Sequence, residues 1–147
     1  MVKVSSVNEM RAIGAKIADQ LKAGDLIILS GELGAGKTAL TQGIGVGLGI
    51  SEITSPTFVI SRIHQGKLPL IHVDAYRLIQ SPGVFLEFED LDLPSKMSDA
   101  VTVIEWGSEL APLLKDEFLE IKINFISDNE RNLEITPHGT RWQGFKL

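Results

Sequence analysis

The stretch Gly31-Glu32-Leu33-Gly34-Ala35-Gly36-Lys37-Thr38 matches the phosphate-binding loop pattern G-x-x-x-x-G-K-[ST] in full. The apolar run 26–29 before it predicts a buried strand, and the segment from Lys37 onward is compatible with a helix. Glycines allow backbone N–H groups to approach phosphate oxygens, and a helix N-terminus favours an anion. In this pattern the lysine contacts the β- and γ-phosphates, and the hydroxyl of Thr38 is placed to ligate Mg²⁺. The sequence therefore predicts a binding site for a nucleoside triphosphate.

Length and composition narrow the protein class. The 147 residues fit one domain, 1–147, and their formal net charge of −5 argues against a broad nucleic-acid-binding surface. The absence of cysteine excludes disulfides and thiolate metal sites. No apolar run approaches the roughly 20 residues of a membrane-spanning helix, and residues 1–4 lack a secretory apolar segment. We therefore expect a cytoplasmic protein that does not use the membrane.

Two helices are predicted around the loop-bearing strand. Ser6 to Glu9 form a capping-box pattern, and apolar residues then recur at helical spacing until the helix ends near Gly24-Asp25. The helix after the loop is unusual because glycines alternate through its second half, at positions 43, 45, 47 and 49. Each interior glycine costs about 1 kcal/mol relative to alanine. This end is predicted to fray or to pack tightly against the sheet, and we favour close packing and early termination over a functional hinge.

The remainder of the chain is rich in strand patterns. Residues 57–74 predict a β-hairpin around a turn at 65–67, and residues 82–98 predict a short helix with an acidic loop. Further strands are expected at 100–104, 118–125 and 132–135. The predicted fold is a P-loop NTPase of class α/β: a three-layer α/β/α arrangement with a mixed central sheet and an inserted β-hairpin.

Two acidic residues are candidates for the metal. A P-loop ATPase needs a carboxylate at the end of a neighbouring strand for Mg²⁺, and both Asp74 and Glu105 directly follow apolar runs. Glu105 follows the more apolar run and is the favoured partner of Thr38. Asp74 is then available to orient or deprotonate the attacking water. Either acid alone could instead be a strand-end cap or a surface ion-pair partner.

Three further residues near the two acids in sequence each have a structural and a functional interpretation. His72 lies on the same strand face as Asp74, but a hydrogen-bonded structural histidine is favoured over a metal ligand, since no third ligand has suitable spacing. Trp106 is either core packing or a stacking surface. Arg77 either stabilises phosphate charge or pairs with a nearby acid, and we favour the pairing.

The order and spacing of four motifs resemble the TsaE (formerly YjeE) family. These motifs are Gly31 to Thr38, Ser55-Pro56-Thr57-Phe58, His72-Val73-Asp74-Ala75-Tyr76-Arg77 and Ile104-Glu105-Trp106. The P-loop alone is unspecific, whereas its combination with H-x-D-x-Y-R and V-I-E-W is highly specific. The resemblance covers almost the whole chain. It implies a bacterial Mg²⁺-dependent ATPase of low intrinsic turnover, needed to form threonylcarbamoyladenosine in tRNA beside the anticodon. It also implies action on TsaD and TsaB, with tRNA met only through that complex.

The resemblance also assigns roles to individual residues. It implies ATP and Mg²⁺ as cofactors, with Thr38 and Glu105 on the metal and with Asp74 and Lys37 needed for turnover. Thr57 is implied to lie in a switch-like loop. The residues implied to bind the nucleotide are Asn8, Leu33, Gly34, Ala35, Gly36, Lys37, Thr38, Thr57 and Arg131, of which Asn8 and Arg131 match regions that approach the base.

Other functions remain open beside the ATPase. A small-molecule kinase is disfavoured because the chain is short, and its central region has only two arginines, Arg62 and Arg77, for a phosphate-clamping lid. A GTPase is disfavoured because the sequence has no guanine-reading N-K-x-D element. A nucleotide-gated assembly module with incidental hydrolysis would use the same phosphate-binding residues as the ATPase.

Overall fold

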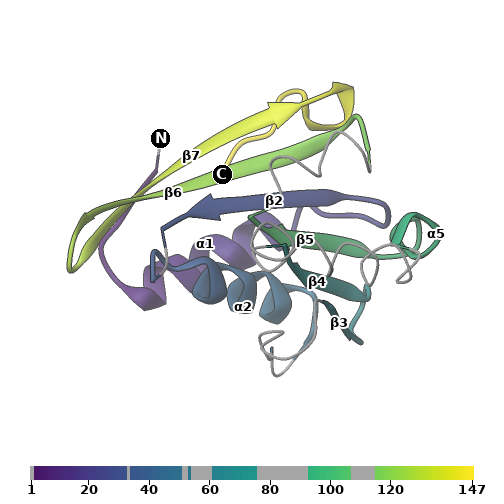
Figure 1. Cartoon of the computed structure of the whole chain (residues 1–147), viewed down its shortest axis with the longest axis horizontal. Coiled ribbons are helices and arrows are strands. Elements are labelled where there is room, and N and C mark those ends of the chain that lie inside the picture. The colour runs from purple at the N-terminus through teal and green to yellow at the C-terminus, as the bar shows by residue number, and fades with distance from the viewer. Residues whose placement is uncertain (1, 33, 51–52, 54–60, 76–92, 107–114) are drawn as a thin grey trace.

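A mixed seven-stranded sheet organises the molecule in the computed structural model, which describes residues 2–32, 34–50, 53, 61–75, 93–106 and 115–147 (Figure 1). The spatial order of the strands is β1-β7-β6-β2-β5-β4-β3. The strands are β1 (Val2–Val4), β2 (Leu26–Gly31), β3 (Ser61–His64), β4 (Leu70–Asp74), β5 (Val101–Glu105), β6 (Phe118–Ser127) and β7 (Glu130–His138). The predicted α/β architecture is confirmed.

The pairing directions place the carboxyl ends of the central strands together. β2 pairs in parallel with β5 and β6, and β4 pairs in parallel with β5. The outer pairs are antiparallel: β3 with β4, β7 with β6, and β1 with β7. In open α/β sheets, ligands bind beyond the carboxyl ends of the parallel strands. The phosphate-binding loop follows β2 at this edge.

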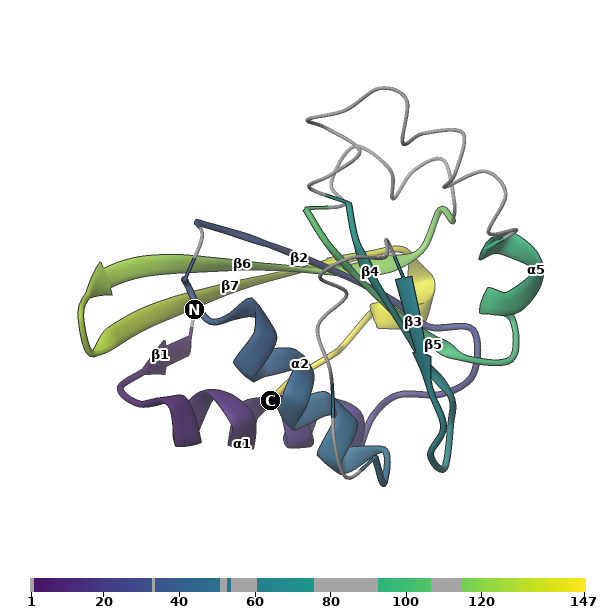
Figure 2. The ribbon, with the colours of Figure 1, turned by 60° about the horizontal axis from the view of Figure 1, so that its bottom comes forward.

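The two sheet faces are covered differently. Along β2, Ile27 and Leu29 belong to the core beneath α1 (Val7–Ala18) and α2 (Lys37–Gly47), which lie side by side on one face (Figure 2). Leu26 and Ile28 alternate with them and belong to a second core that includes Met97 of α5 (Leu93–Met97). The short 3₁₀ helix η1 (Thr140–Trp142) adds buried Trp142 to the first core. In the described part of the chain, no helix has the length and apolar character needed to cross a membrane.

The first helix begins as predicted and ends earlier. The Ser6 side chain accepts a hydrogen bond from the Glu9 backbone N–H at 3.0 Å, while the Glu9 carboxylate accepts one from the Ser5 N–H at 2.7 Å. The α-helix stops at Ala18 rather than near Gly24. Beyond it, the N–H groups of Gln20 and Leu21 donate to carbonyls three residues earlier, so the apolar pattern continues through tighter turns.

Glycines bring α1 and α2 into backbone contact, so the close packing predicted for this helix is present, but against α1 rather than against the sheet. A Cβ atom at Gly14 would lie 2.5 Å from the carbonyl oxygen of Leu40. A Cβ atom at Gly43 would overlap the carbonyl oxygen of Arg11, and one at Gly47 would overlap the side chain of Ala18. The glycines lower the helix propensity of these segments, but because they lack a Cβ atom they allow the two helices to approach closely.

The predicted hairpin is present as β3 and β4, and its second strand is also one of the parallel strands of the main sheet. Its predicted residues 57–60, and residues 82–92 of the predicted acidic loop, lie outside the described residues. The predicted strands at 118–125 and 132–135 are present as the longer β6 and β7, which pair as a hairpin, and β1 has no counterpart in the predicted elements.

Candidate functional site

The phosphate-binding loop joins the end of β2 to the start of α2. Gly34 and Gly36 adopt φ angles of 80° and 116°, in the left-handed region where a side chain is strained. Gly36 also forms the N-cap of α2, so the loop backbone leads directly into the first turn of a helix. This local structure agrees with the loop predicted from the motif, and it is an anion-binding geometry.

Lys37 is buried at the base of this loop, with 6% of its surface exposed. Its Nζ donates hydrogen bonds to the carbonyl oxygens of Gly31 and Glu32, both at 2.9 Å, and lies 4.4 Å from the centre of the Trp106 ring. Burial lowers the pKa of Lys37 below its ordinary value, and the negative charges of Glu105 and Asp74 act in the opposite direction. The lysine is thus a desolvated cation facing two carboxylates.

Asp74 and Glu105 reach the same pocket as the loop. They are register partners on the parallel strands β4 and β5, which places both side chains on the face that carries α2. The pocket has a volume of about 320 Å³ and is lined by Gly34, Gly36, Lys37, Thr38, Asp74, Glu105 and Trp106. The structure therefore brings together six predicted site residues from three separate parts of the chain.

The donor set suits a magnesium ion that is shared with a ligand. Thr38 is exposed at the first turn of α2 and offers a hydroxyl, while Asp74 and Glu105 offer carboxylate oxygens. Among the described residues, no group of three or more His, Cys, Asp or Glu side chains is arranged to hold a metal alone. Mg²⁺ is usually bound by one or two carboxylates together with substrate phosphates, so this pocket fits that mode.

Trp106 takes part in core packing, one of the two roles left open by the sequence, and its role as a stacking surface stays a prediction. Its ring packs against the second core and also lines the pocket beside Lys37. Its φ of 63° is left-handed, a conformation that costs about 1–3 kcal/mol for a residue with a side chain. In this conformation the Trp106 N–H donates to the Leu29 carbonyl at 2.8 Å. No sequence signal pointed to this conformation.

His72 is hydrogen-bonded, as predicted, and its partner is Glu105. The Nε2 atom of His72 lies 2.7 Å from Oε2 of Glu105, and His72 is fully buried. The two residues lie on neighbouring strands and are 33 positions apart in sequence. Sequence spacing therefore did not identify this pair.

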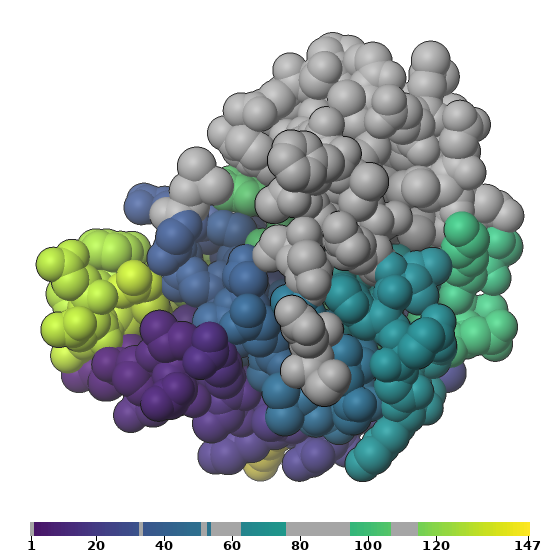
Figure 3. Space-filling view, turned by 90° about the horizontal axis from the view of Figure 1, so that it is seen from below, coloured from purple at the N-terminus to yellow at the C-terminus, as the bar shows by residue number. Residues whose placement is uncertain are grey.

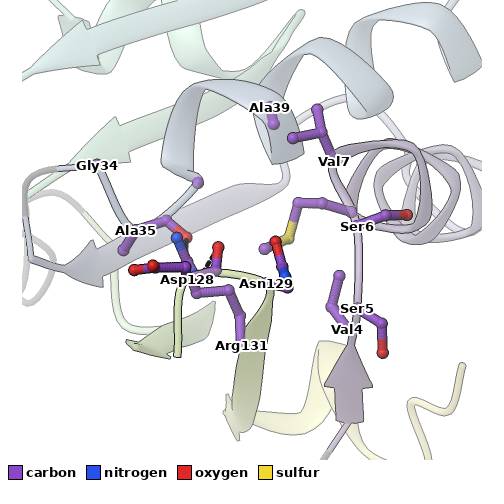
Figure 4. A pocket seen from close by; sticks show the side chains of 12 residues that line it. Val4, Ser5, Ser6, Val7, Gly34, Ala35, Ala39, Asp128, Asn129 and Arg131 are labelled. Atoms are coloured by element: carbon purple, nitrogen blue, oxygen red, sulfur yellow. Dashed lines mark hydrogen bonds between the residues drawn. The ribbon is translucent and has the colours of Figure 1, made fainter. Parts of the chain in front are cut away.

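A second pocket lies on the other side of the loop. Figure 4 shows Gly34 and Ala35 beside Asp128 and Arg131 of the β6–β7 hairpin, opposite Ser5 to Val7. The volume of this pocket is about 300 Å³. Arg131 donates from Nε to the Ala35 carbonyl at 3.1 Å, so the hairpin contacts the loop directly. The space-filling view shows α1, α2 and the hairpin tip together on this face (Figure 3).

The remaining predicted site residues are placed less directly. Asn8 is exposed in the first turn of α1, next to the residues that line the second pocket but not among them. Leu33, Thr57 and Arg77 lie outside the described residues. The roles predicted for these four residues stay predictions.

Comparisons with known proteins agree with one another. A family model described as threonylcarbamoyl adenosine biosynthesis protein TsaE matches residues 4–133. The chain is 48% identical over 141 residues to a tRNA threonylcarbamoyladenosine biosynthesis protein TsaE from Streptomyces coelicolor, which covers 90% of this chain and 93% of that protein. It is 39% identical over 138 residues to a protein of the same name from Bacillus subtilis, covering 92% and 84%.

A solved structure extends the similarity to three dimensions. The crystal structure of Bacillus subtilis YdiB superposes with a TM-score of 0.77 and 34% sequence identity. The match covers 97% of this chain and 87% of that one.

Proposed function

Since this chain belongs to the TsaE family of threonylcarbamoyl adenosine biosynthesis proteins, we propose that it is a Mg²⁺-dependent ATPase of low intrinsic turnover. In this proposal it supports the modification of tRNA by acting on a complex of TsaD and TsaB, and it meets tRNA only through that complex. The family membership supports the pathway, and the site geometry supports the chemistry.

One observation carries the ATPase proposal. The desolvated cation of Lys37 and the hydroxyl of Thr38 line the same pocket as two carboxylates at the ends of adjacent parallel strands. A phosphate chain needs the cation and the loop N–H groups, whereas a hydrolytic water needs an acceptor. The pocket offers both within about 320 Å³.

Each residue then has a distinct task. The loop backbone and Lys37 would bind the phosphates, and Thr38 and Glu105 would hold Mg²⁺, which would neutralise charge on the phosphate oxygens. Asp74 is half-buried beside Glu105 and accepts a proton from the attacking water. The second pocket, which Arg131 borders, receives the nucleoside on the far side of Gly34 and Gly36. Asn8 belongs to the same side of the loop.

The acceptor role of Asp74 makes the proposal testable in the complete pathway. Purified chain, TsaD, TsaB, tRNA and the remaining substrates are incubated with ATP, and threonylcarbamoyladenosine is measured over many cycles. We expect sustained product with the natural chain and with the exposed control Asp116→Asn, but not with Asp74→Asn. Equal product from Asp74→Asn, or with a non-hydrolysable ATP analogue, would contradict the ATPase role and favour a nucleotide-gated assembly module.

A further inference from the structure

His72 is the buried residue that most directly contacts the proposed metal site. β4 and β5 are parallel neighbours, and His72 is the register partner of Val103, two residues before Glu105. His72 and Glu105 therefore project from the same sheet face, and the Nε2 to Oε2 distance is 2.7 Å. The other histidine–glutamate pair in the described residues, His138 with Glu120, is partly exposed and longer, at 3.4 Å.

The chemistry of the pair assigns the direction of its hydrogen bond. A carboxylate only accepts, so the imidazole donates from Nε2. The Nδ1 atom of His72 is buried and has no hydrogen-bond partner among the described residues. The side-chain hydrogen bond that the structure gives His72 is therefore the one from Nε2 to Glu105. A buried carboxylate needs such a donor, because an unpaired charge in an apolar environment is costly.

This contact has a consequence for the charges in the pocket. The ammonium group of Lys37 attracts the Glu105 carboxylate, yet within the described residues the ion-pair partner of Glu105 is His72 and not Lys37. With Oε2 bound to His72, the Glu105 side chain is held in one orientation, and its other oxygen is left for a cation. Without His72, the carboxylate would be free to rotate toward the ammonium of Lys37.

We propose that His72 is a positioning residue, which orients the Glu105 carboxylate for Mg²⁺ and keeps it from pairing with Lys37. The inference rests on the proposed function, because it takes Glu105 as a magnesium ligand. Residues that hydrogen-bond to metal-binding side chains typically alter metal affinity by about 10- to 100-fold when they are replaced.

The test measures binding rather than turnover. Binding of the non-hydrolysable analogue adenylyl imidodiphosphate is titrated against Mg²⁺ and repeated in EDTA. His72→Phe removes the donor and keeps the approximate size of the ring, His72→Gln restores an N–H group, and His138→Phe is the matched control. His138 pairs with Phe118 at the start of β6, whereas the loop lies near Ile123 further along this strand.

We expect His72→Phe to raise the Mg²⁺ concentration for half-maximal binding by about 10- to 100-fold, and His72→Gln to recover part of this loss. Binding in EDTA and the His138→Phe titration should match the natural chain. Unchanged Mg²⁺ dependence in His72→Phe would overturn the positioning role. Equal losses in both His72 variants that extend to EDTA would show a purely structural role. If the natural chain itself binds without Mg²⁺ dependence, the proposed function fails instead.

A measurement on the natural chain covers the case in which His72→Phe does not fold. In ¹⁵N-histidine NMR, the His72 ring should carry its hydrogen on Nε2, and this signal should move in Glu105→Gln. A ring with hydrogen on Nδ1 alone would overturn the proposal.

Discussion

Asp74 and Glu105 stand opposite each other on adjacent parallel strands, but their surroundings differ. Glu105 is 7% exposed and hydrogen-bonded to His72, whereas Asp74 is half-buried at the pocket wall. A held carboxylate suits a metal ligand, and a more accessible one suits a proton acceptor. The difference in burial supports the assignment that the sequence favoured.

Conservative replacements should separate the two carboxylates. Glu105→Gln is expected to weaken the Mg²⁺ dependence of nucleotide binding, because it removes a charged oxygen ligand. Asp74→Asn should preserve binding and reduce ATP turnover by about 10² or more, as expected for a positioned base. Calorimetry with and without Mg²⁺ and a phosphate-release assay would measure both. If Asp74 controls the Mg²⁺ dependence and Glu105 only the rate, the roles are exchanged.

Lys37→Met should weaken nucleotide binding by roughly 10- to 100-fold, because hydrogen bonds to charged groups contribute about 1.5–3 kcal/mol each. The exposed Lys16 in α1 provides the control, and Lys16→Met should bind like the natural chain. Fluorescence titration with a labelled ATP analogue would compare them. Near-normal affinity in a folded Lys37→Met variant would contradict the phosphate-binding assignment.

The lowered pKa of Lys37 predicts a pH-dependent stability. Between its lowered pKa in the folded protein and its ordinary value of 10.5, the unfolded chain binds more protons than the folded one. The contribution of Lys37 to the free energy of unfolding therefore becomes more favourable as the pH rises across this window. In urea unfolding without ligand, the free energy of unfolding of the natural chain should increase relative to that of Lys37→Met as the pH increases toward 10.5. A constant difference across this range would show that Lys37 is not desolvated.

Arg141 should be important for stability because it pairs with the buried carboxylate of Asp25. Its Nε and a terminal nitrogen donate to the two carboxylate oxygens of Asp25 at 2.8 and 2.7 Å, and Asp25 is 2% exposed. Arg141→Ala would leave a buried charge unpaired, at a cost of about 3 kcal/mol or more. Lys3→Ala breaks an exposed pair with Glu130 and should cost under about 1 kcal/mol. Similar midpoints of chemical unfolding for the two variants would refute this ranking.

Gly43→Ala should destabilise the protein although alanine favours helices. The added Cβ would overlap the Arg11 carbonyl oxygen, and overpacking typically costs about 1–3 kcal/mol. Val46→Ala in the same helix is a control, because Val46 is exposed and its replacement should change stability by less than about 0.5 kcal/mol. Thermal unfolding would compare the two, and a more stable Gly43→Ala variant would show that the helices can separate at low cost.

Local patterns predicted the parts of the fold that depend on local chemistry. The capping residues located the start of α1, and the apolar runs before Gly31, Asp74 and Glu105 located β2, β4 and β5. The three-residue strand β1 carries too little pattern, and it forms only because β7 offers an edge to Val2–Val4. The early end of α1 follows from turn hydrogen bonds after Ala18, which apolar spacing does not report.

The site was predictable where a motif joins chemistry to sequence, and not where it depends on neighbouring strands. The loop residues and both carboxylates were identified. The hydrogen bond between His72 and Glu105 depends on strand order and register, which one sequence does not reveal. The left-handed backbone of Trp106 occurs where its N–H donates to Leu29 on β2, a strand distant in sequence. Such features arise only when distant segments are assembled.

The glycines of α2 also bear on how the protein folds. Gly43, Gly45 and Gly47 together weaken the isolated helix by about 3 kcal/mol relative to alanine. The segment 37–47 is therefore not expected to form a helix before α1 docks against it, and the loop at its N-terminus lacks its shape until then. Nucleotide binding should consequently report completed folding rather than local structure. It should also draw the folding equilibrium toward the native state by mass action.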